Sequence, residues 1–153
     1  ASGAAGIQLV SKEQLKIAQK LRENHVTSYN ILSEIDIPGR YFGDGVELIA
    51  KRPVFKFRNQ ELIQVSFNNY DRGDFRLPNN KINDFYTAIR TFDKIANDKE
   101  MQWRHILKPG QLLIFNNWRV MHGRSEFIGK RKMSGCYINK EDFESVCRMN
   151  SIF

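Results

Sequence analysis

One histidine and two arginines follow an apolar segment in the last third of the chain. Leu112 to Phe115 are apolar, and His122 follows them by seven residues, with Arg124 and Arg131 further on. An imidazole is a common metal ligand, and a guanidinium binds a carboxylate through two parallel hydrogen bonds. A lone histidine is more often a surface or capping residue, but the spaced arginines favour a metal site. The pattern predicts that His122 holds a metal, while Arg131 and Arg124 bind a dicarboxylate on it.

Helical and strand patterns precede this segment. Ser11 to Gln14 form a capping-box pattern, which predicts a helix over 11–24. Pro38-Gly39 is interpreted as a break in the chain. In the run from Leu62 to Phe67, alternation predicts a half-buried strand with Gln64 on its polar side. The other expected elements are a helical piece over 28–34, a strand over 54–57, a turn over 58–60, a polar loop over 68–74 and a helix of about 15 residues ending near Ala96.

The remainder of the sequence alternates between strand-like and helical patterns. Strands are expected over 102–107, 111–115 and 131–138, and a helix over 140–149. Cys136 lies within the last of these strands and is expected to be a buried thiol. Strands crossed by covering helices predict one α+β domain over residues 1–153, as part of a β-barrel or jelly roll.

Composition limits the function classes. Of the 153 residues, 41% are hydrophobic, which is typical of a globular protein. There are 24 basic and 17 acidic residues, but the basic ones are scattered, which argues against a nucleic-acid interface. No run reaches the roughly 18 apolar residues that a membrane span needs. The two cysteines predict neither a disulfide framework nor a zinc site, and a reducing compartment is the default.

Several blocks, in order, resemble the trimethyllysine dioxygenase and gamma-butyrobetaine hydroxylase family of taurine dioxygenase-like oxygenases. They correspond to the C-terminal half of that family and cover about residues 47–149. The most specific block is Asn-Trp-Arg-Val-Met-His-Gly-Arg, which ends at Arg124. The others are Phe67-Asn-Asn-Tyr-Asp-Arg, Phe85-Tyr, Lys108-Pro-Gly and Gly135-Cys-Tyr.

The resemblance implies a double-stranded β-helix with covering helices, incomplete at its N-terminus, and a hydroxylase that uses Fe(II) and 2-oxoglutarate. His122 then matches an iron ligand of a facial triad, and Arg131 and Arg124 match arginines that bind 2-oxoglutarate. Ascorbate is an optional reductant. The implied substrate is a small quaternary amine such as trimethyllysine. Tyr137 is expected to face its cation, with core packing as the equal alternative, and Asn68 and Asn69 its polar end.

The chain departs from the family in one respect. The family's other iron ligands form a His-x-Asp motif, and none of His25, His105 and His122 is followed by such a carboxylate. Three explanations stay open: the sequence is a fragment, the protein is a degenerate relative that serves as a binding or structural subunit, or another acidic residue or chain completes the site. A homo-oligomer or a partner chain over open sheet edges is expected, in mitochondria or the cytoplasm.

Overall fold

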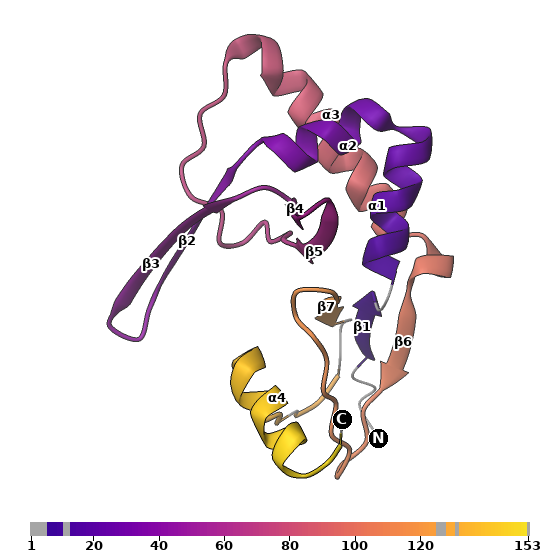
Figure 1. The fold of residues 1–153 in the computed structure, drawn as a ribbon, viewed down its shortest axis with the longest axis vertical. Helices are drawn as coiled ribbons and strands as arrows, with labels where there is room; N and C mark the ends of the chain where they lie inside the picture. Colours follow the sequence, from indigo (N-terminus) through magenta and orange to yellow (C-terminus); the bar gives the residue numbers. More distant parts are fainter. Residues whose placement is uncertain (1–5, 11–12, 125–127, 131, 153) are drawn as a thin grey trace.

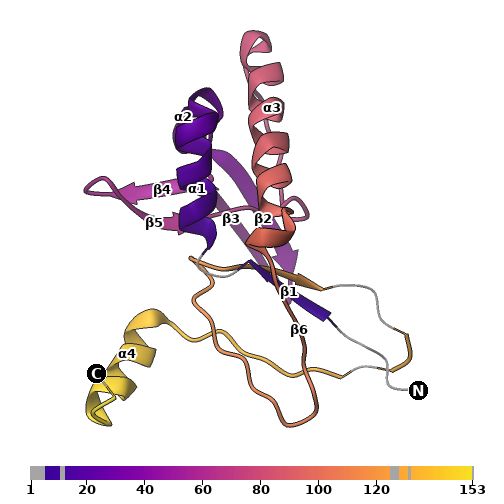
Figure 2. The ribbon, with the colours of Figure 1, turned by 90° about the vertical axis from the view of Figure 1, so that its right-hand side faces the viewer.

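The computed structural model describes residues 6–10, 13–124, 128–130 and 132–152 (Figure 1). Three helices lie together at one end, and small sheets lie beneath them (Figures 1 and 2). None of the described helices combines the length and apolar character that crossing a membrane requires. The helices are α1 (Glu13–Asn24), α2 (Val26–Glu34), α3 (Asn79–Ala96) and α4 (Lys140–Met149), with a 3-10 turn, η1, at Lys99–Met101. The strands are β1 (Gly6–Val10), β2 (Ile37–Gly43), β3 (Val46–Arg52), β4 (Phe55–Arg58), β5 (Glu61–Val65), β6 (Trp103–Ile106) and β7 (Met121–Arg124).

Helices α1, α2 and α3 enclose the core. Each turns a stripe of apolar side chains inward, as the helical spacing predicts, and each contacts the other two. The stripe of α3 is the longest and confirms the predicted helix, which begins three residues earlier than Ile82. The fully buried members of the core are Ile17, Leu21, Leu32, Val54, Phe55, Phe85, Ala88 and Phe92.

The β4–β5 hairpin closes this core from below. Asn59 and Gln60 form its two-residue loop with positive φ angles, which confirms the predicted turn. Gln64 of β5 was predicted to lie on the polar side of the strand. This prediction was wrong, because Gln64 is only 6% exposed. Its Nε2 donates to Oγ of Ser66 at 3.1 Å, so the amide gains a partner that makes burial tolerable.

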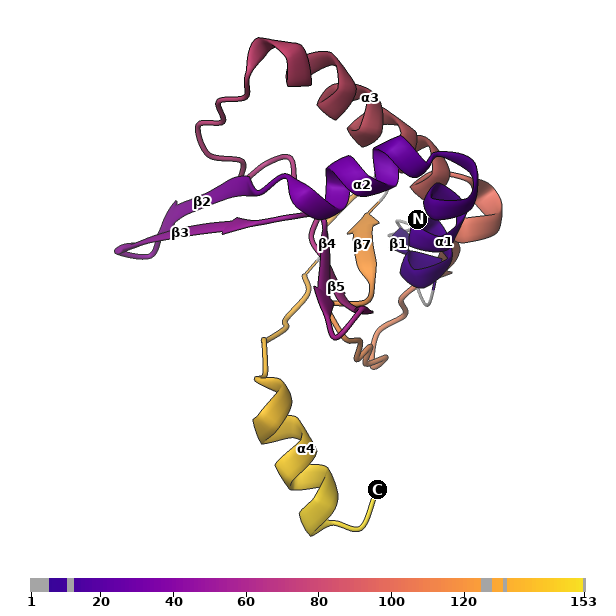
Figure 3. The same ribbon diagram turned by 45° about the horizontal axis from the view of Figure 1, so that its top comes forward.

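The β2–β3 hairpin projects away from the helices (Figure 3). Pro38-Gly39 does not break the chain but lies within β2, because proline is tolerated where a strand lies at a sheet edge. The turn residues are Asp44 and Gly45, with φ angles of 52° and 76°. Asp-Gly is a strong signal for such a turn, and it was overlooked in the sequence.

Substitution of Gly45 by alanine is expected to destabilise the protein by about 1 kcal/mol, because an L-residue is strained at this left-handed position. Urea denaturation measures the difference. Gly135→Ala is the matched control, since an added Cβ there meets no atom within 4 Å and φ is not positive. Equal stability losses in the two variants would contradict the account of the turn.

The third sheet has the order β6-β1-β7 and is antiparallel throughout. Two predicted strands were wrong. Residues 111–115 and the described part of 131–138 form no strand, and Leu112 is 83% exposed and Ile138 64% exposed. Apolar or alternating residues favour a strand, but a strand also needs a neighbouring strand to pair with, and neither segment belongs to any of the sheets formed by the described residues.

The architecture is therefore α+β, as predicted, with three small sheets among the described residues. These sheets do not by themselves confirm a jelly-roll barrel. The predicted C-terminal helix is confirmed as α4, which lies apart from the other helices (Figure 3). The prediction for Cys136 was wrong: its thiol is exposed, because its segment is not a buried strand, whereas Cys147 in α4 is buried.

Candidate functional site

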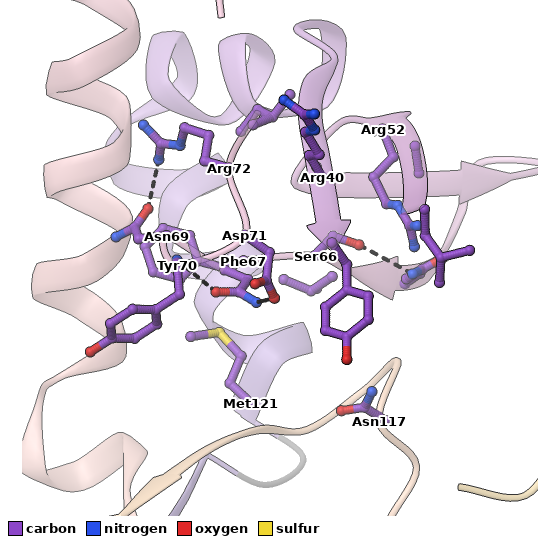
Figure 4. A pocket seen from close by; sticks show the side chains of 18 of the residues that line it. Arg40, Arg52, Ser66, Phe67, Asn69, Tyr70, Asp71, Arg72, Asn117 and Met121 are labelled. Atoms are coloured by element: carbon purple, nitrogen blue, oxygen red, sulfur yellow. Dashed lines mark hydrogen bonds between the residues drawn. The ribbon is translucent and has the colours of Figure 1, made fainter. Parts of the chain in front are cut away.

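An open cavity of about 800 Å³ lies between the β2–β3 hairpin and the segment that leads into β7. Its wall also includes the end of β5 and the loop that follows it. Figure 4 shows Asp71 above Met121, with Arg40 and Arg52 to one side and Asn69 and Arg72 to the other. Four of the predicted site residues line this cavity: Asn68, Asn69, His122 and Tyr137.

His122 is held by the strand in which it lies. β7 pairs with β1, and His122 is opposite Leu9 in that ladder. The histidine therefore lies within a short strand of its own, and not at the end of an apolar strand over 111–115 as predicted. Its exposed ring packs at 4.6 Å between centroids against Phe115. Strand pairing and this contact restrict the imidazole without occupying either nitrogen, so within the described part of the chain the ring is available as a ligand.

The described residues do not fit a complete iron centre. Iron in a facial triad needs two histidines and a carboxylate, and no group of three potential ligands occurs in the part of the chain that the structure describes. His105 is not a candidate for the second iron ligand, because its ring stacks on Trp103 and its Nε2 lies 3.2 Å from Oε1 of Gln111. His122 can thus supply one ligand, and no catalytic step through iron follows from these residues alone.

Arg124 and Arg131 are the two residues predicted to bind the dicarboxylate. Arg124 is the last residue of β7, and its backbone pairs with Ile7 of β1. The structure does not describe its side chain. Arg131 lies outside the described residues. Their roles toward 2-oxoglutarate therefore stay predictions.

The loop over 68–72 is ordered by its own side chains. Asn68 Nδ2 donates to Oδ2 of Asp71 at 2.6 Å, and Asn68 Oδ1 accepts from the backbone N–H of Tyr70 at 2.8 Å. On the other side, Arg72 Nη2 donates to Oδ1 of Asn69 at 2.6 Å. Each amide is therefore oriented by a charged residue three positions later, which sequence reasoning did not foresee.

The same loop is attached to β2. The N–H of Arg40 donates to the carbonyl of Asp71 at 2.7 Å, and the N–H of Gly73 donates to that of Pro38 at 2.9 Å. These bonds hold the loop backbone beside the cavity. The side chains of Asn68 and Asp71 can therefore face the cavity without having to maintain the position of the loop themselves.

Tyr137 reaches the cavity from a segment without regular structure. It is 89% exposed, so the alternative of core packing was wrong. Trp118 is 48% exposed and also lines the cavity. Both rings are accessible to a ligand.

Sequence reasoning missed the charged residues of the cavity wall. Arg40, Arg52 and Arg72 line it, and Asp71 is the one acidic residue among the described lining residues. Arg40 is paired with Glu47 at 2.7 Å, whereas the Nε of Arg72 is buried and has no hydrogen-bond partner among the described residues. The Asp44-Gly45 turn is the sequence signal that predicts β2 and β3, and these two strands carry Arg40 and Arg52.

Comparison with known proteins identifies what this chain is similar to. The family described as "Taurine catabolism dioxygenase TauD, TfdA family" matches residues 13–137. Trimethyllysine dioxygenase from Meyerozyma guilliermondii is 40% identical over 87% of this chain and 34% of its own length. The mitochondrial trimethyllysine dioxygenase of Homo sapiens is 32% identical over 86% and 33%. Gamma-butyrobetaine dioxygenase of Homo sapiens is 28% identical over 79% and 34%. The chain spans about a third of the length of these curated relatives.

Proposed function

Since this chain belongs to the TauD, TfdA family of dioxygenases, we propose that the protein hydroxylates trimethyllysine, or a similar quaternary amine, with Fe(II) and 2-oxoglutarate. The relatives named trimethyllysine dioxygenase support this substrate class. The observation that carries the proposal is that His122, Asn68, Asn69 and Tyr137 line a single cavity although up to 69 residues separate them.

In this proposal each side chain has one role. His122 is one iron ligand, and Arg131 and Arg124 bind the carboxylates of 2-oxoglutarate. Bound iron with this co-substrate would supply the oxidant for a C–H bond. The exposed ring of Tyr137 suits a trimethylammonium group, because the ring face attracts a desolvated cation. Asn68 contacts the polar end of the substrate, together with Asn69.

The fold, domain and compartment are proposed on the same basis. We assign residues 1–153 to the C-terminal part of one jelly-roll oxygenase domain, in which further strands would extend the β6-β1-β7 sheet. A partner chain or second copy would cover exposed apolar residues such as Phe42 and Ile49 on the β2–β3 hairpin. Relatives in mammals are named as mitochondrial and the Meyerozyma relative is not, so mitochondria and cytoplasm are both retained.

An anaerobic titration of the protein with Fe(II) and 2-oxoglutarate tests the proposal. The expected result is a weak visible charge-transfer band that saturates at one iron per chain, followed by turnover of trimethyllysine when oxygen is admitted. Folded protein that never develops the band would contradict catalysis by this chain on its own.

One observation favours a second function. The sequence contains no His-x-Asp, and the described residues do not complete an iron site. A catalytically inactive relative that retains the cavity for binding would have these properties. It would bind trimethyllysine without Fe(II), and its affinity would not change when Fe(II) and 2-oxoglutarate are added.

Replacement of Arg131 by alanine is expected to raise the 2-oxoglutarate concentration needed for half-saturation by at least about tenfold, the scale of losing a charged hydrogen-bonded contact. The titration above measures this. Lys132→Ala removes an equal charge from the neighbouring exposed residue and serves as the control. An unchanged requirement in Arg131→Ala would remove this residue from the role.

A further inference from the structure

We propose that Asp71 determines specificity, by binding the α-ammonium group of an amino-acid substrate while Asn68 binds the adjacent carboxylate. The inference rests on the proposed function and adds a residue and a selectivity to it. Among the described lining residues Asp71 is the single acid beside three arginines. A wall of this kind suits a ligand that carries both charges, rather than a simple anion or cation.

The side chains of Asp71 and Asn68 form a fixed pair. Oδ2 of Asp71 accepts from Nδ2 of Asn68 at 2.6 Å, and the backbone N–H of Tyr70 fixes the other end of that amide. Oδ1 of Asp71 has no partner among the described residues, and one N–H of Asn68 is also free. An acceptor and a donor therefore lie side by side, exposed in the cavity.

This pair matches the polar end of an α-amino acid. An α-carbon carries an ammonium group, which donates hydrogen bonds, next to a carboxylate, which accepts them. A trimethylammonium group cannot use Asp71 in the same way, because it has no N–H. The carboxylate of Asp71 therefore distinguishes the two cationic ends of trimethyllysine and favours the orientation in which the α-ammonium lies at this loop.

Arg72 has a different role, which is to orient Asn69. Nη2 of Arg72 occupies Oδ1 of Asn69 at 2.6 Å. Figure 4 shows this pair on the opposite side of Asp71 from Arg40 and Arg52. We therefore assign recognition of the α-ammonium and its carboxylate to Asp71 and Asn68, and the orientation of the neighbouring Asn69 amide to Arg72.

The test compares binding of two probes to the protein by isothermal titration calorimetry. The probes are trimethyllysine and its deaminated analogue, 6-(trimethylammonio)hexanoate. The unaltered protein is expected to bind trimethyllysine about tenfold more tightly, the scale of one charge-assisted hydrogen bond. In Asp71→Asn this preference is expected to fall to about twofold, through weaker binding of trimethyllysine only.

The substitution Asp71→Asn removes the charge of the side chain but keeps its shape. An amide oxygen at position 71 can still accept from Asn68, and the backbone bond between Asp71 and Arg40 is unaffected, so the loop geometry is retained while the charge is lost. An unchanged thermal midpoint verifies this. Asp74→Asn is the control, because it removes the same charge from an exposed carboxylate of the same segment that does not line the cavity.

The outcomes separate the inference from the proposed function. A retained preference in Asp71→Asn, or an equal loss of affinity for both probes, would overturn the role of Asp71 while leaving quaternary-amine binding intact. An unaltered protein that binds neither probe would overturn the proposed function, and with it this inference. Loss of the preference in Asp71→Asn but not in Asp74→Asn supports it.

Discussion

Substitution of His122 by alanine is expected to abolish the retention of stoichiometric Fe(II). The imidazole lines the cavity on a paired strand, and its nitrogens are not occupied by the contact with Phe115. Changes that merely misorient a metal ligand cost about 10–100-fold in affinity. Removal of the ligand itself should cost more than about 100-fold. Anaerobic titration with 2-oxoglutarate present, monitored by the charge-transfer band and by bound iron after gel filtration, measures the loss.

His105→Ala is the matched control for this prediction. That ring is engaged by Trp103 and Gln111 and does not line the cavity, so its loss should leave the band unchanged. Stoichiometric iron in His122→Ala would refute the assignment. An equal loss in both variants would indicate that iron binding depends on general folding rather than on one imidazole.

The variant Phe55→Ala is expected to lose about 3–5 kcal/mol in the free energy of unfolding, the range for a large aromatic residue removed from a core. Phe55 is fully buried at the start of β4. Its ring contacts Tyr29 of α2 at 5.6 Å and Phe92 of α3 at 5.8 Å, between centroids. A cavity there would loosen the helices from the hairpin that bounds the proposed site. Equilibrium denaturation in urea measures the change.

Phe42→Ala removes the same side chain from the β2–β3 hairpin, where it is 80% exposed. Its effect on unfolding should stay within about 0.5 kcal/mol, because little burial is lost. A loss in Phe55→Ala no larger than that in Phe42→Ala would show that the described core does not carry the stability of the fold.

Local patterns determined those parts of the fold that depend on residues close together in the chain. The stripe that includes Phe85 and Phe92 predicted α3, and the Asn59-Gln60 turn predicted the β4–β5 hairpin. Both signals are local, because helix periodicity and turn conformation involve neighbouring residues. Sequence motifs likewise predicted four of the residues that line the cavity: Asn68, Asn69, His122 and Tyr137.

Tertiary structure decided which of these residues meet and which strands exist. The run 112–115 is apolar yet joins no sheet among the described residues, whereas the short β7 exists because β1, more than 110 residues earlier, pairs with it. Tertiary placement also brought Arg40 and Arg52 to the cavity and tied the Asp71 carbonyl to β2. These are contacts between distant segments, whose free energy depends on surfaces that form only when the chain has folded. The sequence therefore indicated which residues have suitable chemistry, but only the tertiary structure determined which of them lie together.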